Sequence, residues 1–134
     1  MFHGPSVRGP WTAHARNPVV IDAGCARAAG LPFVHKGGLY RPAQDGRVGY
    51  GRSIRVMRIL TLTPDDYAEE LAAEIGPDPG SPFGLGVHTV SVEGDTIWID
   101  GYRAVMHPLA GWFRMRARRS PEVMVGRRID GWAA

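Results

Sequence analysis

This sequence has little cysteine, no long apolar run and no recognisable leader sequence. Its single cysteine, Cys25, excludes an intrachain disulfide and a cysteine-cluster metal site. The apolar stretches are short, as in residues 18–21, and cannot span a bilayer. Residues 1–5 carry no apolar core of a secretory signal. We therefore expect no membrane span and a cytoplasmic protein.

The composition also has little that favours helices. The 134 residues include 18 glycines and 11 prolines, and both residue types are poor in helix interiors. This argues against a helix bundle. Hydrophobic residues make up 44% and charged residues 22% of the chain, which excludes wholesale disorder. The length is that of one domain.

Lysine is almost absent, because Lys36 is the only lysine among the 16 basic residues. The formal net charge is +3, but it is unevenly distributed. Residues 114–134 hold six arginines and two acids, whereas residues 1–113 hold ten basic and eleven acidic residues. The chain thus divides into a body, residues 1–113, and a basic C-terminal tail, residues 114–134.

The basic tail could hold nucleic acid or an anionic membrane surface. It has no interleaved aromatic residues of the stacking kind and no known reader motif. A solvated tail is the simpler interpretation, so nucleic acid is not the partner that we expect.

The body reads as short strands separated by glycine and proline turns. Strands are predicted at residues 31–35, 39–44, 54–62, 87–92 and 96–100. Gly37 and Gly38 can supply the positive φ of a tight hairpin, and residues 93–95 provide a second one. Pro42 lacks an N–H group, so its strand should end or bulge there. The pattern predicts an all-β sandwich, barrel or propeller.

Residues 63–75 are ambiguous. Thr63 can cap a helix, Pro64 suits its first position, and Tyr67 and Leu71 lie four residues apart. Local rules therefore favour a helix over residues 64–75.

Four ordered segments between residues 9 and 103 carry a family resemblance. The first segment is GPWTAHARNPVV at residues 9–20. The second, within residues 26–51, contains ARAAG, LYRPAQD and YG. The third, within residues 62–70, contains LT and YAEE, and the fourth, within residues 86–101, contains GVHT and IDG. Together they resemble five-bladed β-propellers related to glycoside hydrolases. The run is similar to the propeller domain at the N-terminus of plant glucosamine inositolphosphorylceramide transferases and its bacterial relatives.

The resemblance implies an all-β, antiparallel fold. Residues 31–75 would form one blade with residues 67–75 as its outer strand, which opposes the local helix interpretation, and we favour the strand. Five blades need roughly 200–250 residues, so this chain corresponds to about two blades of the C-terminal portion of a five-bladed propeller. An open arc exposes strand edges, from which we expect self-association.

Residues 41–45 hold the best candidate ligand site. Arg41 offers a planar fork of donors, and Gln44 and Asp45 add acceptors, a mixture that suits sugar hydroxyls or an anionic group on a glycan. The alternative is an ion pair of Arg41 with Asp45 that braces a turn.

Two further residues are candidates for ligand binding. Tyr50 could stack on a sugar or pack between blades, and packing is the favoured interpretation. The resemblance implies that His88 lies near the central axis, beside the pocket, although a structural role is the favoured interpretation. A single histidine is no metal signature, so neither a metal nor another cofactor is expected.

No catalytic residue can be assigned. Glycosidic cleavage needs a pair of carboxylates, and Asp22 and Asp100 read as turn residues. We expect a non-catalytic carbohydrate-related module that binds a glycan or assists a glycan-modifying enzyme. The alternatives are a truncated glycoside hydrolase or glycosyltransferase-associated enzyme and a basic-tailed nucleic-acid-binding protein.

Overall fold

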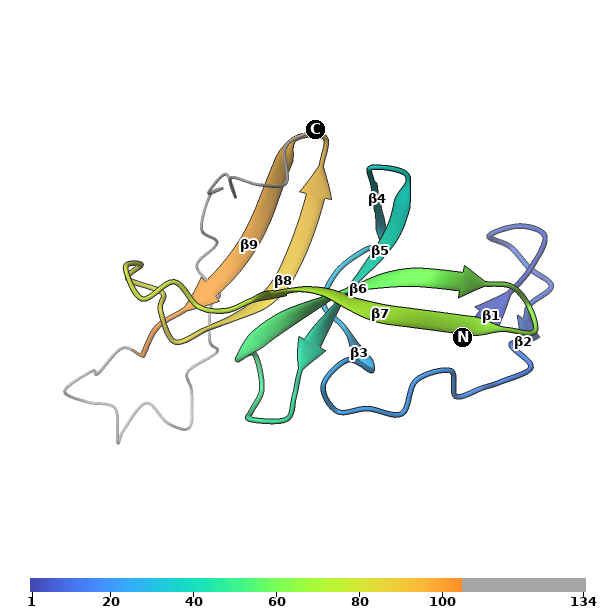
Figure 1. The fold of residues 1–134 in the computed structure, drawn as a ribbon, viewed down its shortest axis with the longest axis horizontal. Helices are drawn as coiled ribbons and strands as arrows, with labels where there is room; N and C mark the ends of the chain where they lie inside the picture. The colour runs from blue at the N-terminus through green and yellow to red at the C-terminus, as the bar shows by residue number, and fades with distance from the viewer. Residues whose placement is uncertain (105–134) are drawn as a thin grey trace.

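The computed structural model describes residues 1–104, which form nine strands and no helix (Figure 1). The strands are β1 (Phe2–His3), β2 (Thr12–Ala13), β3 (Arg27–Ala28), β4 (Phe33–His35), β5 (Gly38–Asp45), β6 (Ser53–Leu62), β7 (Tyr67–Ile75), β8 (Gly86–Glu93) and β9 (Thr96–Tyr102). All pairs of these strands are antiparallel, so the predicted all-β class is confirmed. The predicted tail, residues 114–134, lies outside the described residues.

The largest sheet contains five strands. Its order is β3-β5-β6-β7, and β4 pairs with the beginning of β5 while β3 pairs with its end. Residues 31–75 therefore lie in one sheet with β7 at its outer edge, as the family resemblance implies. Two smaller sheets, β1-β2 and β8-β9, complete the described fold.

The local helix interpretation of residues 64–75 is wrong. Tyr67–Ile75 forms β7, which pairs with β6 from Leu62↔Tyr67 to Ile54↔Ile75. Thr63 does cap: its Oγ1 accepts the N–H of Asp66 at 2.8 Å, but the cap closes a turn whose second bond joins Thr63 N–H to the Asp66 carbonyl. The long β6 edge supplies backbone partners along most of β7, and this tertiary pairing overrides the local preference.

Pro42 neither ends nor bulges β5, contrary to the sequence expectation. The pairs from Leu39↔Ile59 to Asp45↔Ser53 run through Pro42↔Val56 without a register shift. The Pro42 carbonyl accepts the Ala29 N–H at 3.0 Å, on the side of β3 and away from β6. In an antiparallel strand, the N and C=O groups of one residue point to the same side. The N–H group that Pro42 lacks would therefore point between β3 and β4, and no hydrogen bond between β5 and β6 is lost.

The β4–β5 hairpin is present, but its positive φ values fall one residue earlier than expected. They belong to Lys36 (46°) and Gly37 (73°), while Gly38 already belongs to β5 and pairs with His35. Two consecutive positive φ values are typical of the two-residue hairpin turn that matches strand twist. The second predicted hairpin is confirmed, with Glu93 paired to Thr96.

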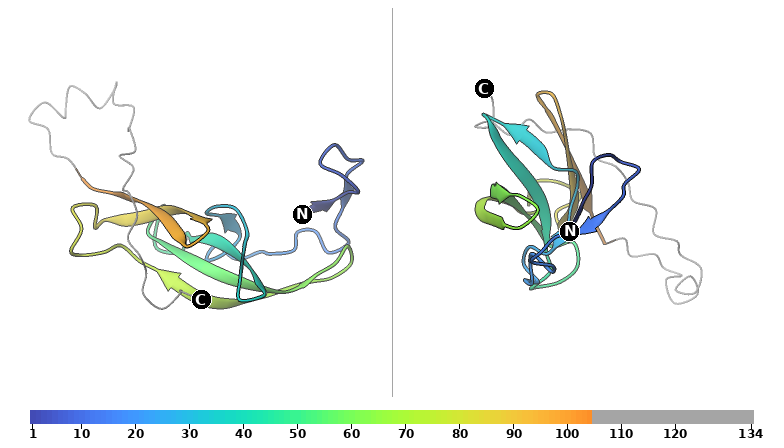
Figure 2. Two further views of the ribbon diagram at one scale, coloured as in Figure 1. Left: turned by 90° about the horizontal axis from the view of Figure 1, so that it is seen from above. Right: turned by 90° about the vertical axis from the view of Figure 1, so that its right-hand side faces the viewer.

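The core lies on both faces of β5 and β6, because successive side chains alternate. On one face, Ile54 packs with Ala29, Val87 and Val90, which brings β8-β9 against the large sheet. On the other face, Ala43 and Met57 pack with Cys25. Figure 2 shows β8-β9 lying over the large sheet.

The β1-β2 ribbon lies beside the turn between β6 and β7 (Figures 1 and 2). The Ala15 N–H donates to the Pro64 carbonyl at 3.1 Å, and Arg16 pairs with Asp66 at 2.7 Å. Within residues 1–104, no helix is long and apolar enough to cross a membrane.

Candidate functional site

A β-bulge in β8 shapes the main polar site. The pairs Val87↔Gly101 and Val90↔Ile99 leave two residues of β8, His88 and Thr89, opposite the single residue Asp100. The Asp100 Oδ1 atom accepts both N–H groups, at 3.0 Å from His88 and 2.5 Å from Thr89. Asp100 is therefore a strand residue that satisfies the bulge, and not the turn residue that the sequence suggested. Bulges redirect side chains and are frequent next to functional sites.

The bulge holds the His88 ring between two polar partners. The Nδ1 atom lies 3.7 Å from Asp100 Oδ2, and Nε2 contacts the Tyr50 hydroxyl. A carboxylate beside Nδ1 favours the tautomer with its proton on that nitrogen. In that tautomer, Nε2 is the acceptor for the Tyr50 hydroxyl.

Tyr50 extends this site toward solvent. Its side chain, in the β5–β6 loop, is 61% exposed, and its ring centroid lies 4.7 Å from that of His88. The Arg27 guanidinium of β3 lies over the same ring, 4.7 Å from the centroid, in a cation–π contact. Arg27 has no carboxylate partner within residues 1–104. We call Arg27, Tyr50, His88 and Asp100 the His88 cluster.

Close backbone contact fixes the Tyr50 loop against β8. A Cβ atom on Gly86 would lie 2.1 Å from the Gly51 carbonyl oxygen, so only glycine permits this approach. Gly51 has a φ of 69° in the left-handed region that favours glycine. Gln44 adds a further tie, because its Nε2 donates to the His88 carbonyl at 3.1 Å.

The strand pleat separates the residues of the predicted Arg41–Asp45 site. Gln44 faces β8, whereas Arg41 and Asp45 lie on the opposite face of β5. There the Arg41 guanidinium donates to both Glu69 oxygens, at 2.9 Å and 2.5 Å, and to the Cys25 carbonyl at 2.8 Å. The acid that partners Arg41 is therefore Glu69 and not Asp45.

Tyr67 closes the Arg41 network. Its hydroxyl donates to Glu69 Oε2 at 2.5 Å and accepts from Arg41 Nε at 3.3 Å. Burial, and then the hydrogen bond to Glu69, raises the pKa of Tyr67 to about 12. The phenol stays a neutral donor, and this largely buried network ties β5 to β7.

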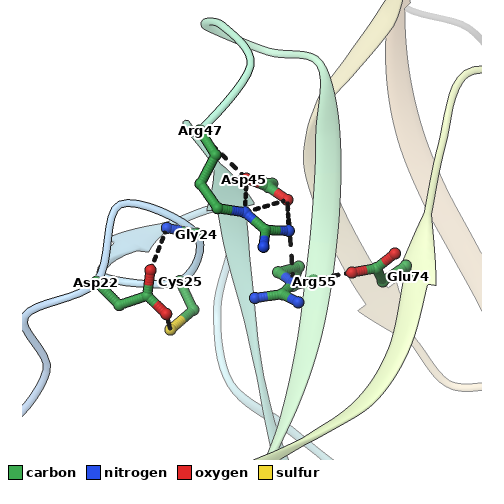
Figure 3. A network of polar contacts seen from close by, with 7 residues as sticks. All are labelled: Asp22, Gly24, Cys25, Asp45, Arg47, Arg55 and Glu74. Atoms are coloured by element: carbon green, nitrogen blue, oxygen red, sulfur yellow. Dashed lines mark hydrogen bonds and ion pairs between the residues drawn. The ribbon is translucent and has the colours of Figure 1, made fainter.

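Asp45 belongs to a second charged network (Figure 3). Arg47 folds back on it with contacts of 2.5 and 2.9 Å, and Arg55 lies between Asp45, at 4.0 Å, and Glu74, at 2.9 Å. The Arg47 side-chain hydrogen bond is the main reason that the pKa of Asp45 falls from 3.8 to about 2. Asp45 is thus an ionised, buried anchor for the loop that leads to Tyr50.

Asp22 and Cys25 lie in the turn before β3 (Figure 3). The Gly24 N–H donates to Asp22 Oδ1 at 2.7 Å and lowers the pKa of that carboxyl below its ordinary value. Burial raises the pKa of the Cys25 thiol. Asp22 is a turn residue, as the sequence indicated.

The structure therefore brings three of the five predicted residues to one place: Gln44, Tyr50 and His88. Arg41 and Asp45 lie elsewhere, in the two ion-pair networks. Sequence reasoning missed Arg27, which carries no local signal, and assigned Asp100 to a turn. The strand alternation of residues 39–45 was the available signal that Gln44 faces away from Arg41 and Asp45.

An apolar groove of about 280 Å³ lies between the large sheet and β8-β9. Its lining is Phe33, Val56, Ala73, Glu74, Ile75, Gly76, Val90, Val92 and Ile97. None of the predicted site residues borders it. Across residues 1–104, no group of three or more His, Cys, Asp or Glu side chains is placed to hold a metal ion.

The fold and the His88 cluster define an antiparallel, all-β chain with a polar surface site at a bulge. Residues 1–78 match the family model described as "Glucosamine inositolphosphorylceramide transferase 1, N-terminal", and the chain belongs to this family. No solved structure matches it significantly.

Three curated relatives carry the name glucosamine inositolphosphorylceramide transferase 1. The Oryza sativa subsp. japonica protein is 37% identical over 71 residues, which is 52% of this chain and 10% of the relative. The subsp. indica protein is 40% identical over 63 residues, 46% of this chain and 8% of the relative. The Arabidopsis thaliana protein is 35% identical over 71 residues, 52% of this chain and 9% of the relative. The match thus spans a tenth or less of their length.

Proposed function

We propose that the protein is a carbohydrate-related propeller module that binds a glycan or another sugar-containing molecule at the His88 cluster. Membership of a family named for a glycosyl transferase supports a carbohydrate-related role. The antiparallel sheet of β4–β7, followed by β8-β9, supports an arrangement as about two blades from the C-terminal portion of a five-bladed propeller.

The observation that carries this proposal is the exposed Tyr50 ring. A sugar ring packs its C–H face on an aromatic ring, and the surrounding polar groups bond its hydroxyls. Arg27 supplies donors over one face of the ring, which leaves the other face for the sugar, and the Tyr50 hydroxyl contacts His88 at the ring's edge. Tyr50 and His88 are held together by the Gln44 hydrogen bond to the His88 carbonyl and by the close packing of Gly86 against Gly51. The binding surface is therefore preformed.

The role is binding, or assistance to a glycan-modifying enzyme, rather than cleavage by a carboxylate pair. Asp45 is held by Arg47, and Asp100 by two backbone N–H groups. Neither is placed as the acid and base that glycosidic hydrolysis needs. A truncated glycoside hydrolase remains the competing function, and its carboxylates would come from other blades.

The test is ligand-observed NMR, followed by calorimetry, against a panel that includes glucosamine and inositol phosphate. Tyr50→Ala and Arg27→Ala should each weaken binding by roughly tenfold, the size of a lost stacking contact. Trp11→Ala removes another exposed aromatic residue, in the connection between β1 and β2, and is the matched control. Binding that survives Tyr50→Ala unchanged would contradict the proposal.

The same arrangement leaves strand edges open, and we extend the proposal to self-association through them. Among the strands of residues 1–104, β7 and β9 each pair on one side only, and exposed edges are templates for pairing with another chain. Light scattering should show dimers or larger species whose population rises with concentration. A monodisperse monomer at all concentrations would overturn this part.

A further inference from the structure

We propose that Tyr50 is a nucleophile which takes an acyl group from an activated ester, with His88 as its general base, Asp100 as a positioning residue and Arg27 as the stabiliser of the developing oxyanion. The inference goes beyond glycan binding and does not require it. Four groups from four separate parts of the chain converge on this site: β3, the β5–β6 loop, β8 and β9.

Tyr50, His88 and Asp100 form a line of polar contacts. A nucleophile within reach of a base, and a base oriented by a third group, are what nucleophilic catalysis needs. Here the Tyr50 hydroxyl contacts His88 Nε2, and Nδ1 faces Asp100 Oδ2 at 3.7 Å. This is the order of roles found in acyl-transfer triads, with a phenol in the place of an alcohol.

Asp100 is held in place through the carboxylate oxygen that does not face the His88 ring. Its Oδ1 accepts the two N–H groups freed by the bulge. The Oδ2 atom can then stabilise the imidazolium that forms when His88 takes a proton. The bulge therefore fixes the orienting carboxylate and the base together.

Arg27 supplies a positive charge at this site. Its guanidinium lies over the Tyr50 ring, 4.7 Å from the centroid, and forms no ion pair with a carboxylate within residues 1–104. Negative charge develops on the substrate's carbonyl oxygen next to the attacking Tyr50 oxygen. A cation over the ring that carries the attacking oxygen lowers the barrier when its charge reaches that carbonyl oxygen.

The step balances with the groups present. As the Tyr50 oxygen bonds to the acyl carbon, its proton passes to His88 Nε2, and the bond from the acyl carbon to the leaving group breaks with its electron pair. The imidazolium then gives its proton to the leaving group or to water. An acyl tyrosine is itself an aryl ester, so the donor must have a leaving group as good as a phenol, as in aryl esters, thioesters and acyl phosphates.

The test uses the full chain and 4-nitrophenyl acetate. We expect a burst of 4-nitrophenolate stoichiometric with protein, and peptide mass spectrometry should place the acetyl group on Tyr50. Tyr102 is an internal control, because it is also exposed, at 42%, and makes no hydrogen bond with a described histidine. Acetylation of Tyr50 and of Tyr102 is compared within the unsubstituted protein, so this result does not depend on the folding of any variant.

Variants then separate the roles. Tyr50→Phe should abolish the burst. His88→Gln should slow it about a hundredfold, as expected for loss of a general base, with partial rescue by added imidazole. Asp100→Asn keeps an acceptor for the bulge but should change the pH profile of the burst, which a purely structural role would not do. Equal acetylation of Tyr50 and Tyr102, or a burst that persists in Tyr50→Phe, would overturn the proposal. Either outcome would leave the proposal of glycan binding untouched, because that proposal is tested by sugar binding.

Discussion

Asp100 binds His88 twice, through the main chain and beside the ring. Its Oδ1 accepts the His88 N–H at 3.0 Å, and its Oδ2 lies 3.7 Å from His88 Nδ1. One carboxylate thereby accepts both N–H groups of the β8 bulge and lies beside the imidazole. The stability of the hairpin and the geometry of the polar site depend on the same side chain.

Removal of the Asp100 side chain should destabilise the protein. Asp100→Ala leaves the N–H groups of His88 and Thr89 without their acceptor, which should lower the free energy of unfolding by about 2 kcal/mol. Asp100→Asn should cost less, because its amide oxygen can still accept. Urea unfolding followed by tryptophan fluorescence measures both. Asp95→Ala, in the exposed turn of the same hairpin, is the control and should change little.

The Arg41–Glu69 pair should be structural. Their side chains are 15% and 8% exposed, so Arg41→Ala or Glu69→Ala leaves a buried charge without its partner and should cost about 3 kcal/mol. The double variant Arg41→Met with Glu69→Leu should recover much of this loss, because neither charge remains. Denaturant midpoints test this. Full stability of Arg41→Ala with lost glycan binding would instead favour a ligand-binding role for Arg41.

Asp45 should make part of the stability depend on pH. Its pKa in the folded protein, about 2, lies below the ordinary value of 3.8. The ionised carboxylate therefore contributes its full stabilisation at any pH well above 3.8. The contribution should disappear as the pH falls from about 4 to 2. Asp45→Asn should flatten this part of the stability curve, as measured by thermal unfolding at a series of pH values. An unchanged acid limb in Asp45→Asn would contradict the assignment.

Gly30 should be essential for docking β8 against the large sheet. A Cβ atom there would lie 1.9 Å from the Val90 carbonyl oxygen, where the Val90 N–H donates to Ala29 at 2.8 Å. Gly30→Ala should therefore push β8 away, lower the melting temperature by several degrees at least and increase hydrogen exchange at Val90. A Cβ on Gly76 meets nothing within 4 Å, so Gly76→Ala is the matched control. Equal behaviour of the two variants would disprove this docking role.

Much of the local structure could be predicted from the sequence. Alternating apolar residues placed β6, β8 and β9, and glycine-containing turns placed the two hairpins. These features depend on neighbours a few residues away, which the sequence displays directly. The segments that carry the family resemblance also indicated that residues 67–75 form a strand, although Thr63, Pro64 and the four-residue spacing favoured a helix.

The candidate site was only partly predictable. Tyr50 and His88 were recognised individually, but Arg27 and Asp100 were not connected with them, because 23 and 12 residues separate these partners along the chain. Gln44 was grouped with Arg41 and Asp45, which the pleat places on the other face of β5.

By itself, then, the sequence determined the all-β class, the turn positions and the absence of a disulfide, because each follows from residue chemistry over short distances. Three features became visible only in the folded chain: the pairing with β6 that overrides the helix preference of residues 64–75, the place of Pro42 inside β5, and the role of Asp100 as acceptor for the bulge. The reason in each case is where backbone N–H and C=O groups find their partners, since a buried polar group must be satisfied by whatever lies across from it in space.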